Sequence, residues 1–141
     1  MITSKVEYLI QILVDLATID RDKYSLSREV AERQGIPPKY LPQLMSILSK
    51  KGWVASARGA KGGVRLAADP STITVRDVIE VSGDPFVVKK CLDESYPCSG
   101  RESCVLLPLW QKAQAELERS MASTTIAELA AAASNTGCSS K

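Results

Sequence analysis

Apolar side chains recur at helical spacing over the first twenty residues and predict a helix from about Ser4 to Ile19. Intervals of three and four residues place these side chains on one face of the helix. The polar stretch Asp20-Arg21-Asp22 that follows ends the pattern. The residues of the apolar face are Val6, Leu9, Ile10, Leu13, Leu16 and Ala17.

A second, shorter helix is predicted over residues 28–33. Ser25 or Ser27 precedes it and can cap its first turn, because a serine hydroxyl accepts a hydrogen bond from a free backbone N–H. Gly35 follows it, and glycine ends helices because it readily adopts left-handed backbone. The tripeptide Ile36-Pro37-Pro38 then predicts an extended corner.

A third helix is predicted from Lys39 to Lys51, and Gly52 ends it. Pro42 requires this helix to begin near Lys39, because proline is tolerated only in the first turn. Two helices joined by a tight corner are typical of a helix-turn-helix motif. The predicted inward face of the third helix consists of Leu41, Leu44, Ile47 and Leu48.

A β-hairpin is predicted directly after the third helix. Residues 53–56 and 64–67 have the character of two short strands, and the turn over residues 58–63 contains three glycines. A lysine in a glycine-rich turn can indicate phosphate binding, but this spacing is not that of a P-loop. The sequence therefore predicts a mainly α fold with a small β-wing, a winged helix-turn-helix domain over residues 1–83.

Helical spacing returns after residue 104 and predicts a long amphipathic helix, with Pro108 in its first turn. Thr125 can cap a final short helix that ends near Ala133. A long apolar stripe beyond a small domain needs a partner, so we expect a dimerisation helix within residues 105–133 and a flexible tail over residues 134–141. The stripe consists of Leu106, Leu109, Trp110, Ala113, Leu117 and Met121.

The net charge of +2 hides a gradient along the chain. Residues 1–70 contain eleven Lys and Arg against seven Asp and Glu, a net +4, whereas residues 71–141 contain seven against nine, a net −2. No acidic residue lies between Lys39 and Arg65, a stretch that contains six cations including both ends. A solvated charged face has the same composition, but its position on a winged helix favours DNA binding.

The third helix is expected to lie in the major groove of double-stranded DNA and the wing in the minor groove. We expect Tyr40, Gln43 and Ser46 to face base edges. The basic residues are expected mainly at phosphates and, at the tip of the wing, in the minor groove. The remaining predicted contacts are Lys39, Lys50, Lys51, Arg58, Gly59, Lys61, Gly62 and Arg65.

Three of the four cysteines gather in a polar loop over residues 84–104. Cys91, Cys98 and Cys104 have the spacing Cys-x6-Cys-x5-Cys. Thiolates suit an iron-sulfur cluster, zinc or copper(I), and the spacing lacks the tight Cys-x2-Cys pairs of common structural zinc sites. Inert buried cysteines are the alternative. The chain contains no histidine, which excludes a Cys-His or Ser-His-Asp arrangement, so we expect a sensor and not an enzyme.

A series of landmarks occurs in order over residues 3–130 and resembles the Rrf2 family of bacterial winged-helix regulators. The pattern is most similar to the IscR-like iron-sulfur branch, with NsrR and RirA as relatives. The landmarks are Ser4-Lys5, Glu7-Tyr8, Leu13, Leu16-Ala17, Val30-Ala31, Gly35-Ile36-Pro37, Tyr40-Leu41, Gln43-Leu44, Arg58-Gly59, Gly62-Gly63, Ile73-Thr74-Val75, Asp77-Val78-Ile79, the three cysteines, Leu109-Trp110 and Thr125-Ile126-Ala127-Glu128-Leu129.

This resemblance implies a homodimeric transcription factor, usually a repressor, that binds a palindromic operator and responds to a cluster held by Cys91, Cys98 and Cys104. It favours [2Fe-2S] over [4Fe-4S]. The regulated genes would serve iron-sulfur assembly, iron supply, or the redox or nitric oxide response.

The fourth cluster ligand is open. In the IscR-like branch a histidine three residues after the last cysteine supplies it, and Leu107 occupies that position here. Glu7 stands where some relatives use a carboxylate from the first helix of the partner subunit, and it is the first candidate. Cys138, water or a small thiol are the alternatives.

The N-terminal segment contains neither a signal-peptide core nor a membrane span, so we expect a cytoplasmic protein without a membrane partner or a small-molecule substrate. Three other classes remain open. They are a cluster-free regulator of the same family that responds to a protein partner, a zinc-stabilised winged-helix regulator, and an iron-sulfur redox protein.

Overall fold

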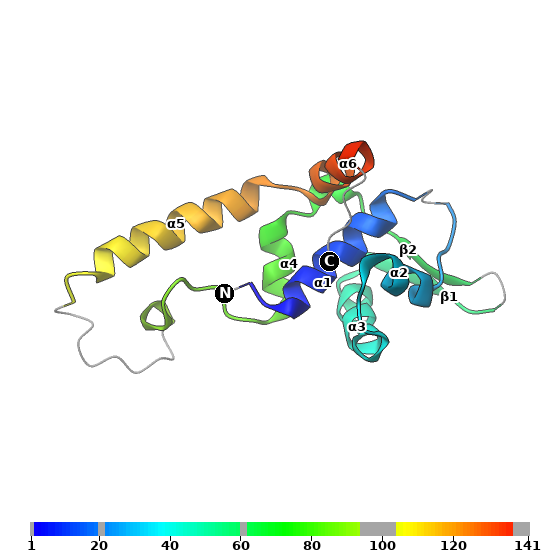
Figure 1. The fold of residues 1–141 in the computed structure, drawn as a ribbon, viewed down its shortest axis with the longest axis horizontal. Coiled ribbons are helices and arrows are strands. Elements are labelled where there is room, and N and C mark those ends of the chain that lie inside the picture. The colour runs from blue at the N-terminus through cyan, green and yellow to red at the C-terminus, as the bar shows by residue number, and fades with distance from the viewer. Residues whose placement is uncertain (1, 20–21, 60–61, 94–103, 137–141) are drawn as a thin grey trace.

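A computed structural model describes residues 2–19, 22–59, 62–93 and 104–136 (Figure 1). Most described residues are helical, and the two strands form one antiparallel hairpin, which confirms the mainly α fold with a small β-wing. The elements are α1 Ser4–Ala17, α2 Ser27–Gln34, α3 Leu41–Lys51, β1 Val54–Ala57, β2 Gly63–Leu66, α4 Val75–Ser82, α5 Leu107–Ser123 and α6 Ile126–Thr136, with short 3₁₀ turns at Pro38–Tyr40, Pro70–Thr72 and Lys90–Leu92.

Helix α1 lies at the centre of the winged domain, as its apolar periodicity predicts. Leu9, Ile12 and Leu13 are completely buried against side chains of α2, α3, the wing and α6. Thr3 caps the helix by accepting a hydrogen bond from the Val6 backbone N–H. The helix ends at Ala17, two residues before the predicted end.

A polar clamp joins α2 to α1. The buried Asp15 carboxylate accepts hydrogen bonds from the Arg33 guanidinium, at 2.7 Å, and from the Gln34 amide, at 3.0 Å. The hydrogen bond to Asp15 raises the pKa of Arg33 above the ordinary value. The predicted serine cap of α2 is wrong: Leu26 is the cap residue and has no side-chain hydrogen bond. The backbone of Ser25 instead pairs with Val64 of β2.

Helix α3 begins at Leu41, after a 3₁₀ turn over Pro38–Tyr40, and not at Lys39 as predicted. Pro42 has no N–H to donate to the Pro38 carbonyl, so the α-helical pattern cannot extend back over this turn. Pro42 lies in the first turn of α3, as the proline rule requires.

The wing is displaced by one residue from each predicted strand, with Val54 opposite Leu66 and Ala57 opposite Gly63. Gly62 closes its turn by donating a backbone hydrogen bond to Gly59. A Cβ atom at Gly62 would lie 2.2 Å from the Ala57 carbonyl oxygen, so only glycine fits there.

Helix α4 was not predicted, although its sequence was noted as a family landmark. A reciprocal capping box starts it: Asp77 N–H donates to the Thr74 hydroxyl, and Thr74 N–H donates to the Asp77 carboxylate. Val78 and Ile79 are buried against the domain core. The helix therefore completes the winged domain and ends at Ser82, just before the cysteine loop.

The last helix, α6, returns to this domain. Thr125 caps it, as predicted, by accepting a hydrogen bond from the Glu128 N–H at 3.2 Å. Ile126 is completely buried in the winged-domain core, and its N–H donates to the Ile73 carbonyl. The helix ends at Thr136 and so covers the first residues of the predicted tail; residues 137–141 lie outside the described part of the chain.

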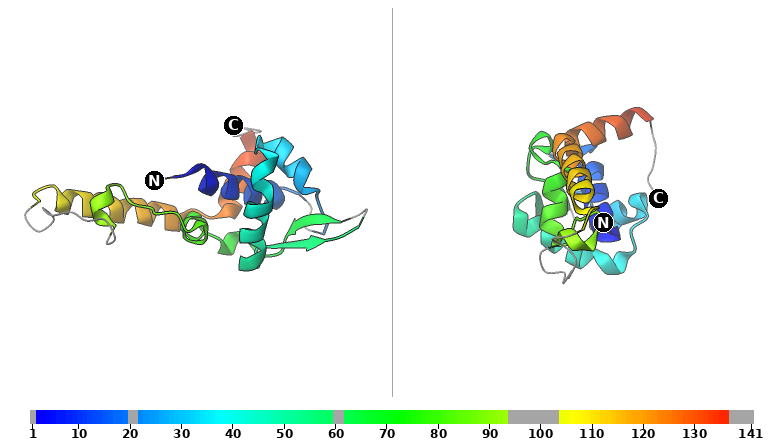
Figure 2. Two further views of the ribbon diagram at one scale, coloured as in Figure 1. Left: turned by 90° about the horizontal axis from the view of Figure 1, so that it is seen from below. Right: turned by 90° about the vertical axis from the view of Figure 1, so that its left-hand side faces the viewer.

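Helix α5 has a different environment. It projects from the body of the molecule at the end opposite the wing (Figures 1 and 2). None of its 17 residues is buried. Leu117 and Met121, near its C-terminal end, pack partly against Val6, Val75 and Phe86, whereas its N-terminal half lies farther out. Within the described residues, no helix is long and apolar enough to cross a membrane.

Candidate DNA-binding and cluster-binding surfaces

The outward face of α3 carries the residues predicted to contact DNA. Gln43 and Ser46 lie one turn apart, and both are exposed. Leu44 and Leu48 point into the core and orient this face outward, whereas Ile47 is only half-buried. The basic residues Lys39, Lys50 and Lys51 are exposed at the two ends of the motif. The arrangement presents polar and cationic groups on one helix, as DNA recognition requires.

Tyr40 lies at the start of this surface and packs against α1. Its ring stacks on the Tyr8 ring, with centroids 5.9 Å apart, and the Lys39 ammonium lies 5.1 Å from the Tyr40 centroid. A small hollow of about 200 Å³ beside the stack is lined by Lys5, Gln43 and neighbouring residues. The position of α1 is therefore coupled by direct contact to the first residues of the recognition motif.

The predicted wing residues lie at and beside the hairpin turn. Arg58 and Gly59 are exposed, Gly62 is buried within the turn, and Lys61 lies outside the described residues. The Arg65 guanidinium lies 5.4 Å from the centre of the Tyr24 ring, so it is held on the strand and half-buried. The described cations of α3 and the wing thus belong to one winged domain, although they come from separate segments of the sequence.

Cys91 and Cys104 line the same hollow, of about 500 Å³, at the outer end of α5. Both are half-buried and neither forms a disulfide. Lys89, Lys90 and Trp110 also line the hollow. Two soft thiol donors that line one hollow fit an iron-sulfur cluster, because thiolates are the ligands that such clusters prefer.

The third predicted ligand, Cys98, lies outside the described residues. Among residues that the structure describes, no three His, Cys, Asp or Glu side chains gather closely enough to hold a metal ion. The structure therefore brings together two of the three cysteines and leaves the complete ligand set as a prediction.

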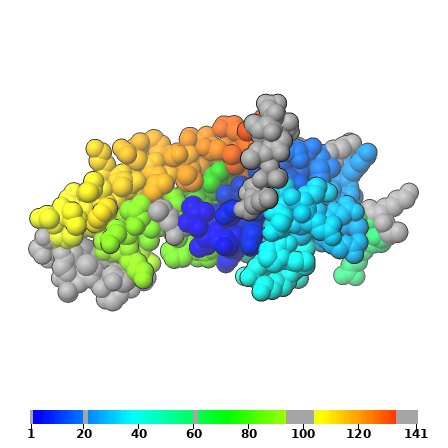
Figure 3. All heavy atoms as spheres, in the orientation of Figure 1, coloured from blue at the N-terminus to red at the C-terminus, as the bar shows by residue number. Residues whose placement is uncertain are grey.

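The beginning of the cysteine loop is fastened to α5 by Gln114. Its side-chain amide donates a 2.6 Å hydrogen bond to the Phe86 carbonyl and accepts one of 2.8 Å from the Val88 N–H. The Lys89 ammonium also lies over the Trp110 ring, 5.8 Å from its centroid. In the space-filling view, this light-green segment lies against the yellow and orange atoms of α5 (Figure 3). The cysteine hollow is thus attached directly to α5.

The candidate fourth ligand, Glu7, is exposed on α1. It borders a groove of about 300 Å³ between α1 and α6, which is also lined by Ile2, by Val14 of α1 and by Leu129 of α6. Leu107, where a histidine would stand, is half-buried in the first turn of α5. Cys138 lies outside the described residues. An exposed carboxylate on α1 is accessible to a second subunit, and its role as a ligand stays a prediction.

Sequence patterns did not identify Tyr8 and Gln114 as functional residues. Tyr8 was noted only as a family landmark, and Gln114 was not singled out. The sequence holds no signal for Gln114, because both of its partners are backbone groups, the Phe86 carbonyl and the Val88 N–H. The Tyr8–Tyr40 contact joins residues of two different helical segments, so it depends on the tertiary fold.

Comparison with known proteins identifies relatives over nearly the whole chain. The Rrf2 family, described as iron-dependent transcriptional regulators, matches residues 2–132. The HTH-type transcriptional regulator IscR of Vibrio vulnificus is 34% identical over 128 residues, which cover 91% of this chain and 76% of the relative.

Two solved structures have the same fold. CymR, the global cysteine regulator of B. subtilis, matches with a TM-score of 0.74 and 29% identity, over 94% of this chain and 97% of that chain. IscR of T. potens matches with a TM-score of 0.73 and 30% identity, over 100% and 93%. The relatives are transcriptional regulators and not enzymes.

Proposed function

Since the chain belongs to the Rrf2 family of winged-helix transcriptional regulators and to its IscR-like branch, we propose that it is a homodimeric repressor controlled by an iron-sulfur cluster. Cys91, Cys98 and Cys104 would supply three ligands. The observation that carries the proposal is the pair of free cysteines, Cys91 and Cys104, that line one hollow beside two lysines.

The cluster would supply a redox-active and chemically labile centre whose presence changes the conformation of the cysteine loop. The protein's contribution is to orient the thiols through Gln114, which fixes the loop just before Cys91 by its hydrogen bond to Val88. We favour [2Fe-2S] over [4Fe-4S], with Glu7 of the partner subunit as the fourth ligand.

Helix α5 would form the dimer interface. Val105, Leu106 and Leu109 are 89%, 49% and 54% exposed in the single chain, at the outer end of this helix. Exposed apolar side chains in one patch are typical of a protein interface. A two-fold dimer through α5 would place two winged domains for half-sites one helical turn apart, which suits a palindromic operator.

In the DNA complex, α3 would enter the major groove and the wing the minor groove. Tyr40, Gln43 and Ser46 would face bases, and the exposed lysines of α3 would contact phosphates. The regulated genes would serve iron-sulfur assembly, iron supply, or redox or nitric oxide responses, and the protein would act in the cytoplasm. We also propose four functional parts of the chain: the winged domain over residues 1–83, the cysteine loop over 84–104, the dimerisation region over 105–133 and the tail over 134–141.

A second candidate is a cluster-free regulator of the same family. The fold is as similar to CymR, described as a global cysteine regulator, as it is to an IscR, so the overall fold does not show what this chain responds to. A cluster-free protein would be colourless, and its DNA binding would not change when the three loop cysteines become serine.

Anaerobic purification followed by absorption spectroscopy and iron and sulfide assays tests the cluster. We expect a coloured protein that loses its visible absorption and most of its iron in Cys91→Ser, Cys98→Ser and Cys104→Ser. Cys138→Ser is the matched control and should keep both. A colourless, iron-free wild-type protein would contradict the cluster proposal and favour the cluster-free candidate.

A filter-binding series at increasing salt tests the DNA interface. Each lost cation that neutralises DNA charge, at a phosphate or in the minor groove, should reduce the slope of log affinity against log salt by about 1, because fewer counterions are released. Arg58→Ala and Lys61→Ala should therefore weaken binding and flatten the slope. Arg119→Ala is the control, because it removes an exposed cation from α5. Equal slopes in all four proteins would argue against the proposed wing contacts.

A further inference from the structure

We propose that Asp84 is a positioning residue that couples the cysteine loop to the recognition helix by holding the N-terminus of α1. The proposal rests on the proposed function for its DNA site and for the sensing role of the loop. Asp84 directly follows α4 and Gly83, and it begins the segment that leads to Cys91.

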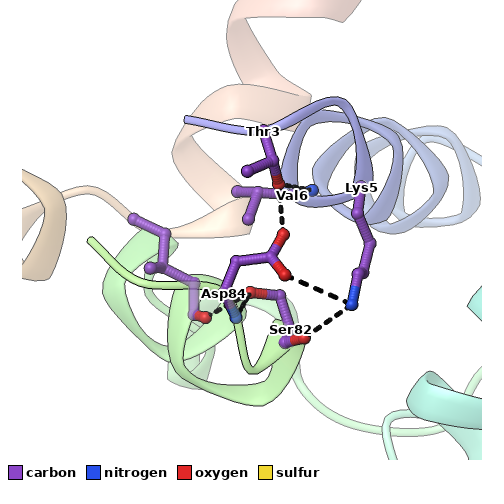
Figure 4. Close-up of polar contacts among 6 residues, drawn as sticks. Thr3, Lys5, Val6, Ser82 and Asp84 are labelled. Carbon is purple, nitrogen blue, oxygen red and sulfur yellow. Dashed lines mark hydrogen bonds and ion pairs between the residues drawn. The ribbon is translucent and has the colours of Figure 1, made fainter. Parts of the chain in front are cut away.

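The two oxygens of the Asp84 carboxylate bind Thr3, which caps α1, and Lys5 in its first turn (Figure 4). One oxygen accepts a short hydrogen bond from the Thr3 hydroxyl, and the other lies 3.3 Å from the Lys5 ammonium. The same ammonium donates a 3.0 Å hydrogen bond to the Ser82 carbonyl, at the end of α4. We call the contacts of Asp84 with Thr3 and Lys5 the clasp. The Asp84 side chain is only 21% exposed, so the clasp is partly shielded from water.

The Thr3 hydroxyl hydrogen bond is the largest cause that lowers the pKa of Asp84, with a further contribution from Lys5. The carboxylate is therefore ionised at neutral pH, and both α1 contacts are charge-assisted. Thr3 also accepts from Val6 N–H, so the clasp includes the cap of α1.

The segment after Asp84 is held on its other side by α5. Phe86 is buried against Val6, and its carbonyl binds Gln114. Residues 84–88 thus contact α1 at one end and α5 at the other. Residues 84–88 are therefore held at both ends, and a shift of the loop at Cys91 would be transmitted to their contacts with α1.

Helix α1 carries this constraint to the DNA surface. Tyr8 lies one turn after Lys5 and stacks on Tyr40 at the start of the recognition motif. The hollow beside the stack is lined by both Lys5 and Gln43. The contacts form a continuous path from Cys91 through residues 84–88 and α1 to the start of α3, and packed side chains and hydrogen bonds of this kind can carry coupling between two such sites.

Linkage gives a test that does not need a cluster. If the loop and the DNA surface are coupled, then bound DNA must change the loop, just as the loop changes DNA binding. The apo full-length protein would be alkylated with iodoacetamide, with and without a duplex of about 30 base pairs enriched from a random pool by the protein itself. Mass spectrometry would give the rate at Cys91.

We expect DNA to change the alkylation rate of wild-type Cys91 by at least about fivefold, the lower end of typical coupling. In Asp84→Asn the rate should change less than about twofold, while the variant still binds the duplex. Glu80→Gln is the control, since it removes an exposed carboxylate from the end of α4, with the same charge change, and should behave as wild type.

Lys5→Met breaks the clasp from the α1 side and replaces Asp84→Asn if that variant does not fold. Equal DNA effects in wild type and in the clasp variant would overturn the proposal, and so would a wild-type rate that DNA does not alter. Failure of the proposed function is read separately, from the iron content and from duplex binding itself.

Discussion

The winged domain and α5 differ in how many of their residues are buried, although they belong to one short chain. In the winged domain, α1 alone buries seven of its fourteen residues, and α6 returns to complete the same core. Helix α5 is longer, yet none of its residues is buried. Burial of apolar surface is the main stabilising contribution to folding, so the winged domain is stabilised internally. In the proposed function, the exposed residues Leu106 and Leu109 at the outer end of α5 would be covered by a partner subunit, and the cysteine hollow would hold a cluster.

The largest effect is expected from a core truncation in the winged domain. Leu48→Ala removes a completely buried side chain and should lower the free energy of unfolding by about 2–5 kcal/mol. Leu26 is 39% exposed. Its truncation in Leu26→Ala should change the free energy of unfolding by only about 0.5 kcal/mol or less. Urea unfolding measures both, and equal losses would break the contrast between buried and exposed leucines.

The clamp between α1 and α2 should rank second. Asp15→Ala leaves the Arg33 guanidinium and the Gln34 amide without their buried acceptor and should cost about 1–3 kcal/mol of unfolding free energy. Glu32→Ala, an exposed carboxylate on α2, should be nearly neutral. The same urea measurement decides, and a neutral Asp15→Ala would show that the clamp adds no stability.

Substitutions on the exposed face of α5 should change the dimer dissociation constant. Leu109→Ala truncates an exposed apolar side chain at the proposed interface. It should raise the dimer dissociation constant about tenfold, which corresponds to about 1.4 kcal/mol. Lys112→Ala removes an exposed polar side chain from the same helix and should have little effect. Sedimentation velocity across a concentration series separates the two, and unchanged dimerisation in Leu109→Ala would remove this residue from the interface.

The smallest effect on the free energy of unfolding is expected at Asp84, where the cysteine loop contacts the winged domain. Because the pKa of folded Asp84 lies below its ordinary value of 3.8, its stabilisation is present above that pH and is lost as pH falls through the lowered pKa. Asp84→Asn should therefore cost at most about 1 kcal/mol at pH 7 and less at pH 3. Urea unfolding of the apo protein at both values, with Glu80→Gln as control, measures the difference. A cost that does not shrink in acid would contradict a contribution from the ionised carboxylate.

Much of the winged domain could be predicted from the spacing of apolar residues and from the glycines that end helices. The spacing of Leu9, Leu13 and Leu16 indicated α1, and glycines after α2 and α3 marked their ends, where Gly35 and Gly52 have positive φ. The missed helix, α4, is short, and its capping box was the available signal. The α-helical part of α3 begins two residues after the predicted start near Lys39, because Pro42 has no N–H to extend the α-helical hydrogen bonds back over the 3₁₀ turn.

The contacts that link the regions could not be predicted in the same way. Thr3 and Asp84 are 81 positions apart, and a threonine and an aspartate at these positions serve equally well as ordinary caps. Gln114 binds backbone groups, which have no sequence signature. Such contacts depend on how whole elements pack, so sequence indicated the cysteine cluster and the DNA face but not the path between them.

Comparison of operator affinity between the cluster-loaded and apo forms of the wild-type protein tests the central claim most directly. Fluorescence anisotropy at one fixed salt concentration, under anaerobic conditions, gives both dissociation constants. We expect them to differ by at least about fivefold, and we expect no such difference between matched preparations of Cys104→Ser. Equal affinities for loaded and apo wild-type protein would contradict the claim that a cluster beside α5 controls the winged domain.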